Sequence, residues 1–175
     1  KSKVAIYYCM LILCAGCSSC KNGSALFVAM PSAQTGIHFV NAVQENNRFN
    51  VLDYMNLYTG AGVAAGDINN DGLTDLFFSG NGVSGRLYLN RGNWHFEDVT
   101  AASGLTSDRW QTGASMVDIN QDGWLDIYVN VSGSEKFGDL ANQLYINNGN
   151  GTFSEQAAAY GLAEKRLTMN ASFFD

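Results

Sequence analysis

The stretch Asp67–Asp75, DINNDGLTD, decides the fold, and it recurs in the same chain at Asp118–Asp126 as DINQDGWLD. Each copy has Asp or Asn at its first, third, fifth and ninth positions and Gly at its sixth. A backbone that winds around one point can bring such alternate oxygens together, and the glycine permits the sharp turn. The two stretches therefore predict two loops that bind a metal ion.

The similarity between the two copies extends beyond the loops. LYLN at residues 87–90 corresponds to LYIN at 144–147, and Phe96 corresponds to Phe153. The first Asp and this Leu are 20 residues apart in the first copy and 26 apart in the second. The six additional residues lie in SGSEKFGDLAN, residues 132–142. Such self-similarity at a fixed period is typical of a repeat protein, with the insertion in a loop.

A third repeat is expected at the end of the sequence. The interval from Leu87 to Asp118 is 31 residues, and the same interval from Leu144 leads to Asp175. NASFFD before this point matches GASMVD before the second loop, so Asp175 is predicted to be the first ligand of a third loop. We therefore expect this chain to be part of a longer protein. Gly62, Gly113 and Asn170 coincide in this alignment, and their residue types are those that best tolerate a left-handed backbone.

Each repeat is predicted to form four short strands. Segments rich in Tyr, Phe, Val and Ile alternate with Asn-Gly and Gly-Asn turns. The segments are GVAAG, DLFFSG, RLYLN and HFEDV in the first repeat and ASMVD, DIYVNV, QLYIN and TFSEQ in the second. AASGL and AAAYGL predict one helical turn each. Four strands in about 50–60 residues have the size of a β-propeller blade, so an all-β fold is expected.

The recurring aromatic residues of the two repeats are expected to pack between blades. They are Tyr88, Tyr145, Phe96 and Phe153.

The ligand types in the loops favour Ca²⁺. The predicted side-chain ligands are Asp67, Asn69, Asp71 and Asp75 in the first loop and Asp118, Asn120, Asp122 and Asp126 in the second, with the carbonyls of Leu73 and Trp124 between them. Such an all-oxygen set selects calcium over zinc. An EF-hand is excluded because position twelve is Phe78 or Val129, where an EF-hand has Glu. Two Asx-rich turns that bind no metal are the alternative.

The pattern D-x-N-x-D-G-x-x-D between strands, followed by LYLNRG and FEDVTAASGL, resembles FG-GAP/VCBS-type repeats. The resemblance covers about residues 60–175, and the lead-in TGIHFVN at 35–41 is also typical. It implies blades of an integrin-α-like propeller, closest to the bacterial ASPIC/UnbV-associated group. It further implies a ring of about seven blades with one structural Ca²⁺ in each. In this chain the ligands would be those named above and Asp175.

The N-terminus predicts export and a lipid anchor. Lys1 and Lys3 precede the apolar run VAIYYCMLILCA at 4–15, which has the length of a secretory signal core. The following Ala-Gly-Cys resembles the lipobox of bacterial lipoproteins, in which Cys17 would be acylated; Cys20 is the rival site. An ordinary signal peptide or a buried helix are the alternatives. All four cysteines lie in the first twenty residues, so no disulfide is expected in the exported part.

These patterns give a predicted domain organisation. We expect a lipoprotein signal at 1–16, a tether at 17–34, a lead-in strand segment at 35–59, repeats at 60–110 and 111–167, and the start of a third repeat at 168–175. The net charge is −6, and six of the eleven Asp lie in the two loops. With only ten Lys and Arg, the chain is not expected to bind nucleic acid.

The predicted function is that of a binding or adhesion module, held at a bacterial outer membrane or cell surface by its lipid anchor. Its partner would be a glycan or a protein, and residues 132–142 are a candidate contact loop. Trp124 is the preferred sugar-stacking residue, whereas Trp94 and Trp110 are expected to pack in the core or rim. The alternative is the propeller domain of a polysaccharide lyase or hydrolase. This chain shows no G-x-S-x-G motif, so we expect it to lack enzymatic activity.

Overall fold

The computed structural model describes residues 26–47, 50–133 and 138–174. The chain divides into two compact units, residues 1–30 and 31–175. The described part of the first unit, residues 26–30, contains no helix or strand. The predicted signal, the acylated Cys17 and the predicted ligand Asp175 lie outside the described residues.

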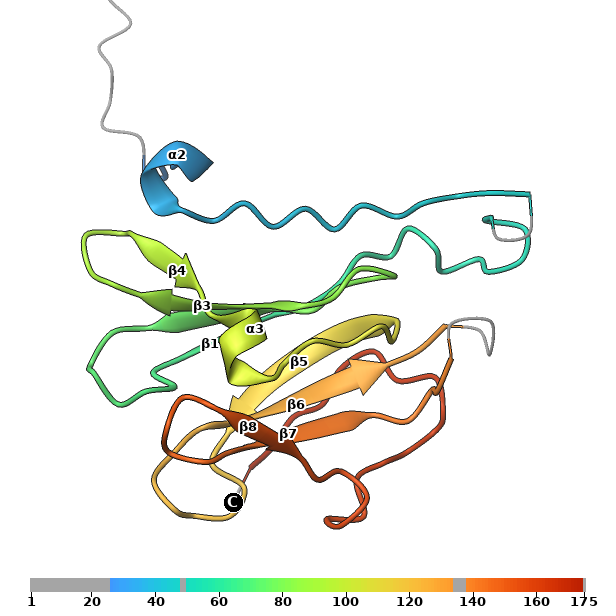
Figure 1. The fold of residues 1–175 in the computed structure, drawn as a ribbon. Helices are drawn as coiled ribbons and strands as arrows, with labels where there is room; N and C mark the ends of the chain where they lie inside the picture. Colours follow the sequence, from blue (N-terminus) through green and yellow to red (C-terminus); the bar gives the residue numbers. More distant parts are fainter. Residues whose placement is uncertain (1–25, 48–49, 134–137, 175) are drawn as a thin grey trace, which may run out of the picture. The chain divides into compact units, whose positions relative to one another are not determined.

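The second unit begins with a short helical turn and continues into a four-stranded antiparallel sheet (Figure 1). The strands pair in chain order, each with the next along the sequence. The elements are α2 (Ser32–Thr35), β1 (Val63–Gly66), β2 (Asp75–Phe78), β3 (Arg86–Asn90), β4 (Phe96–Asp98) and the helical turn α3 (Thr100–Ser103).

A second sheet repeats this topology. Its strands are β5 (Gln111–Val117), β6 (Asp126–Val131), β7 (Gln143–Asn147) and β8 (Phe153–Glu155), again paired antiparallel in chain order. The registers correspond, since Asn90 pairs with Phe96 in the first sheet and Asn147 with Phe153 in the second. The prediction of an all-β fold built from blades of four antiparallel strands is confirmed.

The two sheets lie face to face and share one core (Figure 1). Phe77 and Leu87 of the first sheet pack in the same cluster as Ile127, Val129 and Tyr145 of the second. Alternation along the strands produces this arrangement, because every second side chain points to the same face. Of the four recurring aromatic residues, Tyr88, Tyr145 and Phe96 are buried, and Phe153 is half-buried.

Two glycines bring the sheets into close contact. A methyl group added at Gly62 would lie 2.7 Å from the Cα of Gly113, and one added at Gly113 would collide with the carbonyl of Met169. Gly62, Gly113 and Asn170 are of types that tolerate a left-handed backbone, but none of them has a positive φ. The physical reason for glycine at the first two positions is the close approach of neighbouring backbones.

A row of buried amides joins the lead-in and the sheets at one end. Asn41 donates to Asn81 Oδ1 at 2.7 Å, and Asn81 donates to the carbonyl of Gln111 at 2.8 Å. Gln111 in turn donates to Gln143 Oε1 at 3.2 Å and accepts the Gly80 N–H at 3.2 Å. These hydrogen bonds satisfy amide groups that would otherwise lack partners where the lead-in and the two sheets meet.

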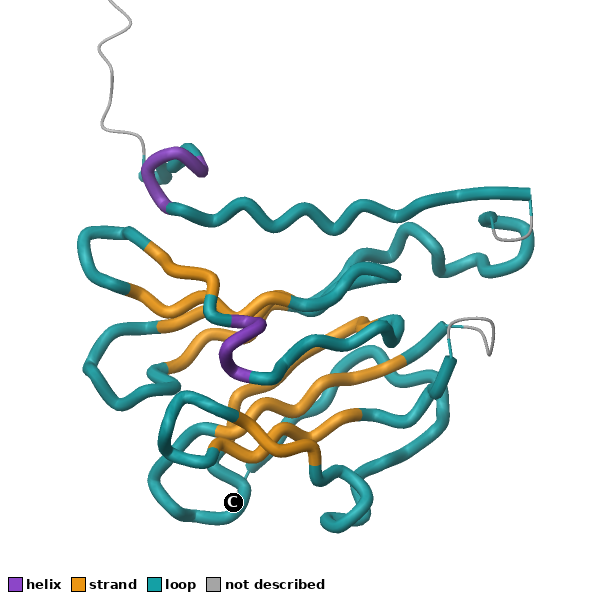
Figure 2. The backbone as a smooth tube through the Cα atoms, viewed as in Figure 1, coloured by secondary structure: helices purple, strands orange, loops and turns teal. Residues whose placement is uncertain are grey.

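The lead-in runs as an extended segment along the first sheet (Figure 2). Its Phe39 ring lies 5.6 Å from the Phe78 ring, and the His38 N–H donates to the Tyr88 hydroxyl at 3.3 Å. The lead-in thus covers the face of the first sheet that points away from the second. Among the described residues, no helix has the length and apolar character needed to cross a lipid bilayer.

The described residues of the predicted lead-in strand segment form no strand, and two smaller predictions also differ from the structure. AAAYGL does not form a helix; it makes a turn in which Tyr160 N–H donates to Gln156 and Leu162 N–H donates to Ala157. Strand β5 starts at Gln111, three residues before the predicted start, because its first residues pair with the end of β6.

Candidate metal-binding loops

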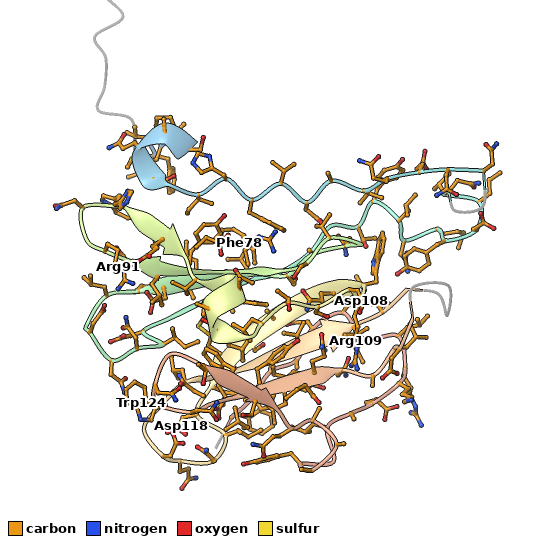
Figure 3. All side chains as sticks on the ribbon, viewed as in Figure 1. Phe78, Arg91, Asp108, Arg109, Asp118 and Trp124 are labelled. Carbon is orange, nitrogen blue, oxygen red and sulfur yellow. The ribbon has the colours of Figure 1, made fainter. Side chains whose placement is uncertain are left out.

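The two Asp-rich stretches form the β1–β2 and β5–β6 connections. Both lie at the same end of the sheets, opposite the end where Asp108 and Arg109 are found; Asp118 and Trp124 mark the second loop in Figure 3. Neither loop is flanked by helices, which agrees with the exclusion of an EF-hand.

The first Asp of each loop accepts two backbone N–H groups from the middle of its own loop. Asp67 accepts from Asp71 at 3.1 Å and from Gly72 at 2.8 Å. Asp118 accepts from Asp122 at 3.1 Å and from Gly123 at 2.9 Å. The two carboxylates therefore point toward the backbone of their own loops and stabilise the turns.

The third and fifth positions are also linked in the same way in both loops. Asn69 Nδ2 donates to Asp71 Oδ2 at 2.9 Å, and its Oδ1 accepts the Asp71 N–H at 3.1 Å. The corresponding distances for Asn120 and Asp122 are 2.8 and 3.1 Å. All four of these side chains belong to residues at the surface or half-buried, so the loops remain open to solvent.

The ninth position is different, because its carboxylate is fully buried. Asp75 accepts the Ile68 N–H at 3.0 Å and the Asn90 N–H at 2.7 Å. Burial raises the pKa of Asp75, the N–H groups of Asn90 and Ile68 oppose this shift, and the charges of Asp71 and Asp67 add to it.

Asp126 repeats this arrangement in the second loop. It accepts the Ile119 N–H at 3.1 Å and the Asn147 N–H at 2.8 Å. Its pKa is raised by burial first, with the charges of Asp122 and Asp118 acting in the same direction. Each loop thus carries a buried carboxylate whose pKa lies above its ordinary value, and a nearby positive charge would lower that pKa.

Left-handed residues at equivalent positions shape the loops. The fourth residues, Asn70 and Gln121, have φ values of 58° and 59°, and the sixth, Gly72 and Gly123, have 85° and 88°. Glycine at the sixth position adopts this conformation without steric cost.

The predicted ligands are all oxygen donors, as calcium prefers, and their role as ligands remains a prediction. Each loop brings three carboxylates and one amide to one turn. Among the described residues, however, no three or more His, Cys, Asp or Glu side chains are arranged so that they could hold a metal ion. The oxygens are instead paired with N–H groups of the loop, as described above. To give Asp71 Oδ2 to a cation, the loop must break the Asn69–Asp71 side-chain hydrogen bond. The carbonyl contributions of Leu73 and Trp124 remain predictions.

The loops are connected to each other by residues that the ligand pattern did not include. Asn70 Nδ2 donates to the Gly123 carbonyl at 3.0 Å, and Asn147 Nδ2 donates to the Ile68 carbonyl at 2.9 Å. The backbone N–H groups of Asn90 and Asn147 also donate to the buried carboxylates of Asp75 and Asp126. Their recurrence at the end of LYLN and LYIN was the signal that could have identified them.

The three tryptophans differ from one another in exposure. Trp124 is half-buried; it packs on Gly149 and lines an apolar cavity of about 290 Å³ between the repeats. Trp110 is buried, as predicted, whereas Trp94 is 67% exposed. The prediction of core or rim packing for Trp94 is therefore wrong, because its hairpin projects beyond the sheet.

The candidate contact loop at 132–142 is described only in part. Asp139 forms ion pairs with Arg109 at 3.0 Å and with Lys165 at 3.3 Å. Arg109 also donates to the Ala141 carbonyl at 2.6 Å. These contacts attach the described end of the insertion to Arg109 at the end of the first repeat and to Lys165 near the end of the second.

Repeated four-stranded sheets with an Asp-rich loop between the first two strands define a protein built from β-propeller blades. The FG-GAP-like repeat family matches residues 67–129, which run from the first loop through the second loop into β6. The chain is thus an FG-GAP repeat protein.

Curated relatives support this assignment. The chain is 30% identical over 107 residues to cartilage acidic protein 1 of Xenopus tropicalis, which covers 52% of this chain and 16% of the relative. It is 35% identical over 103 residues to integrin alpha-4 of Xenopus laevis, and this match covers 53% of this chain and 10% of the relative. It is 31% identical over 134 residues to integrin alpha-2 of Bos taurus, covering 66% and 11%. The chain therefore spans only a small part of these relatives' length.

Proposed function

We propose that this chain is part of an exported β-propeller that serves as a binding or adhesion module and is stabilised by one calcium ion in each Asp-rich loop. The observation that carries the proposal is that the two loops agree hydrogen bond by hydrogen bond. The distances from the first Asp of each loop to its two N–H donors agree within 0.1 Å between the repeats. Chance turns would not reproduce the same residue types, contacts and backbone angles 51 positions apart.

Calcium would be held by the ligands predicted from sequence. In the first loop these are Asp67, Asn69, Asp71, the carbonyl of Leu73 and Asp75; in the second they are Asp118, Asn120, Asp122, the carbonyl of Trp124 and Asp126. Bound calcium supplies positive charge that offsets the repulsion among three carboxylates. It also favours the ionised form of the buried Asp75 and Asp126, whose pKa values are otherwise raised. The ion would thereby fix the β1–β2 and β5–β6 hairpins without a disulfide.

An extracellular location is consistent with this role. Calcium-binding modules outside the cell commonly have dissociation constants of about 10⁻⁴–10⁻³ M, which suits millimolar calcium. Two of the relatives are named as integrin alpha chains. Attachment to a bacterial outer membrane through Cys17 and the closure of about seven blades into a ring belong to the same proposal.

The partner of the module would be a glycan or a protein. The alternative of a polysaccharide-processing enzyme is favoured by no contact among the described residues. His38 and His95 are both exposed, and no hydrogen bond connects either side chain with a serine or carboxylate in the described part. We therefore do not propose a catalytic role.

Thermal unfolding of the full chain in calcium and in EDTA tests the calcium role. At calcium about ten times the dissociation constant, one bound ion stabilises the fold by about 1.4 kcal/mol, so EDTA should lower the Tm. Asp71→Asn should reduce this calcium-dependent difference in Tm, because it removes one ligand charge from the first loop.

The matched control is Asp108→Asn, which makes the same charge change at an exposed aspartate outside the loops. It should keep the full difference between calcium and EDTA. Equal melting curves in calcium and EDTA for the wild-type protein would refute the structural role of calcium.

A further inference from the structure

Trp94 lies at the tip of the β3–β4 hairpin with 67% of its surface exposed. Arg91, at the base of this hairpin, is labelled in Figure 3. An exposed tryptophan on a short, hydrogen-bonded hairpin presents a large flat apolar surface to solvent. Such surfaces are frequent in recognition sites because the indole combines an apolar face with one N–H donor.

The backbone at Trp94 is strained. Its φ is 61°, and the preceding Asn93 has a φ of 52°. A left-handed conformation is unfavourable for a bulky residue. Because Asn90 and Phe96 correspond to Asn147 and Phe153 in register, Trp94 is equivalent to Gly151, whose φ is 83°. The second repeat thus has glycine where the first has an exposed indole. Strain of this kind is a pointer to function when packing does not account for the residue.

An open groove of about 730 Å³ lies between this hairpin and the first Asp-rich loop. Trp94, Phe96 and Leu73 supply apolar surface to it, and Asn90, Asn93 and Thr74 supply polar groups. Asn93 is exposed, and its side chain makes no hydrogen bond to another described residue, so its amide is free to bind a ligand. A mainly apolar wall with a few amide and hydroxyl groups is the usual composition of a small-molecule site.

The groove carries no ionisable side chain, although the chain has a net charge of −6. The nearest charged pair on the hairpin, Arg91 and Glu97, is joined at 2.7 Å and is thus mutually neutralised. A charged ligand would lose hydration here without gaining a counter-charge. The groove is therefore matched to a neutral ligand that has both hydroxyl groups and an apolar face.

We propose that this groove binds a neutral saccharide, with the face of one hexopyranose ring stacked on Trp94 and its hydroxyls bound by the amide of Asn93. The inference rests on the proposed binding function and specifies its ligand class. Binding through the indole would explain why the first repeat keeps a strained tryptophan at the position where the second repeat has glycine.

The test is binding of the calcium-saturated full chain to an array of neutral hexasaccharides of glucose, mannose, galactose and N-acetylglucosamine, with uronic and sulfated glycans alongside. Neutral glycans should bind, and Trp94→Gly should weaken binding by about tenfold or more. This variant introduces the residue found at the equivalent position and relieves the backbone, so its Tm should not fall. Trp94→Phe should retain part of the affinity.

Tyr160→Ala is the matched control, because Tyr160 is an exposed aromatic residue at a turn away from the groove. It should leave binding unchanged. Absence of binding to any neutral glycan, binding restricted to acidic glycans, or equal binding by Trp94→Gly would each overturn the saccharide site. None of these results changes the calcium-dependent Tm, so failure of this inference is distinguishable from failure of the calcium role.

Discussion

At Asp75, one buried carboxylate connects three parts of the first repeat. It ends the loop, begins β2, and accepts N–H groups from Ile68 at the start of the loop and Asn90 at the end of β3. Asp126 does the same with Ile119 and Asn147. These residues therefore organise their hairpins even before any cation is considered. The remaining Asp residues of the loops accept N–H groups only from within their own loop.

Replacing this carboxylate by an amide should destabilise the repeat. In Asp75→Asn, the new NH₂ group must face one of the two N–H donors, so one hydrogen bond to a charged acceptor is lost. We expect the free energy of unfolding to fall by about 1.5–3 kcal/mol. Denaturant unfolding in EDTA measures this cost separately from calcium binding.

Asp108→Asn again serves as the exposed control and should change the free energy of unfolding little. If Asp75→Asn unfolds at the same denaturant concentration as wild type in EDTA, the two hydrogen bonds do not hold the hairpin as described.

The sequence predicted which side chains lie in the loops but not which of them are buried. The spacing of Asp67, Asn69, Asp71 and Asp75 was sufficient to place a turn of alternating oxygens. It did not distinguish the exposed Asp71 from the buried Asp75, because burial depends on the pairing of β2 with β3. Trp94 was missed for a similar reason, since its exposure follows from the left-handed hairpin tip.

At the scale of elements, the eight strands in the described part of the chain were predictable from alternation and turn residues. Their observed bounds fall within three residues of the predicted segments. The Asn-Gly signal at Asn148–Gly149 lies in the β7–β8 hairpin, where Gly149 has a φ of 70°. Contacts between sheets were less predictable. Glycine at position 62 suggested a backbone conformation, whereas its purpose is to let β1 approach β5.

This close approach gives a prediction at the same scale. Gly62→Ala should lower the free energy of unfolding by about 1–3 kcal/mol, because the methyl group would meet the backbone of Gly113, which cannot rotate away. Gly66→Ala is a matched control in the neighbourhood: its methyl group would meet the side-chain ends of Leu125 and Met116, which can move.

Denaturant unfolding of both variants checks this argument. We expect a clearly larger loss for Gly62→Ala than for Gly66→Ala. Equal losses would show that the two sheets are not in backbone contact at Gly62.

At the scale of the molecule, the second unit is a pair of equivalent blades whose loops are placed at one end and whose buried amides are placed at the other. The second sheet packs on one face of the first, and the lead-in covers its other face. The repeat itself could be read from the sequence because the same residues recur at fixed intervals. The groove beside Trp94 could not be read in this way, because residues 72–76 and 90–96 come together there only in the folded repeat.

Calcium titration of the EDTA-treated full chain by isothermal calorimetry tests the central claim most directly. Wild type should bind calcium with measurable heat, and Asp71→Asn and Asp122→Asn should each remove one ion from the stoichiometry, while Asp108→Asn removes none. Absence of calcium uptake by the wild-type chain, or an unchanged stoichiometry in both loop variants, would contradict the account.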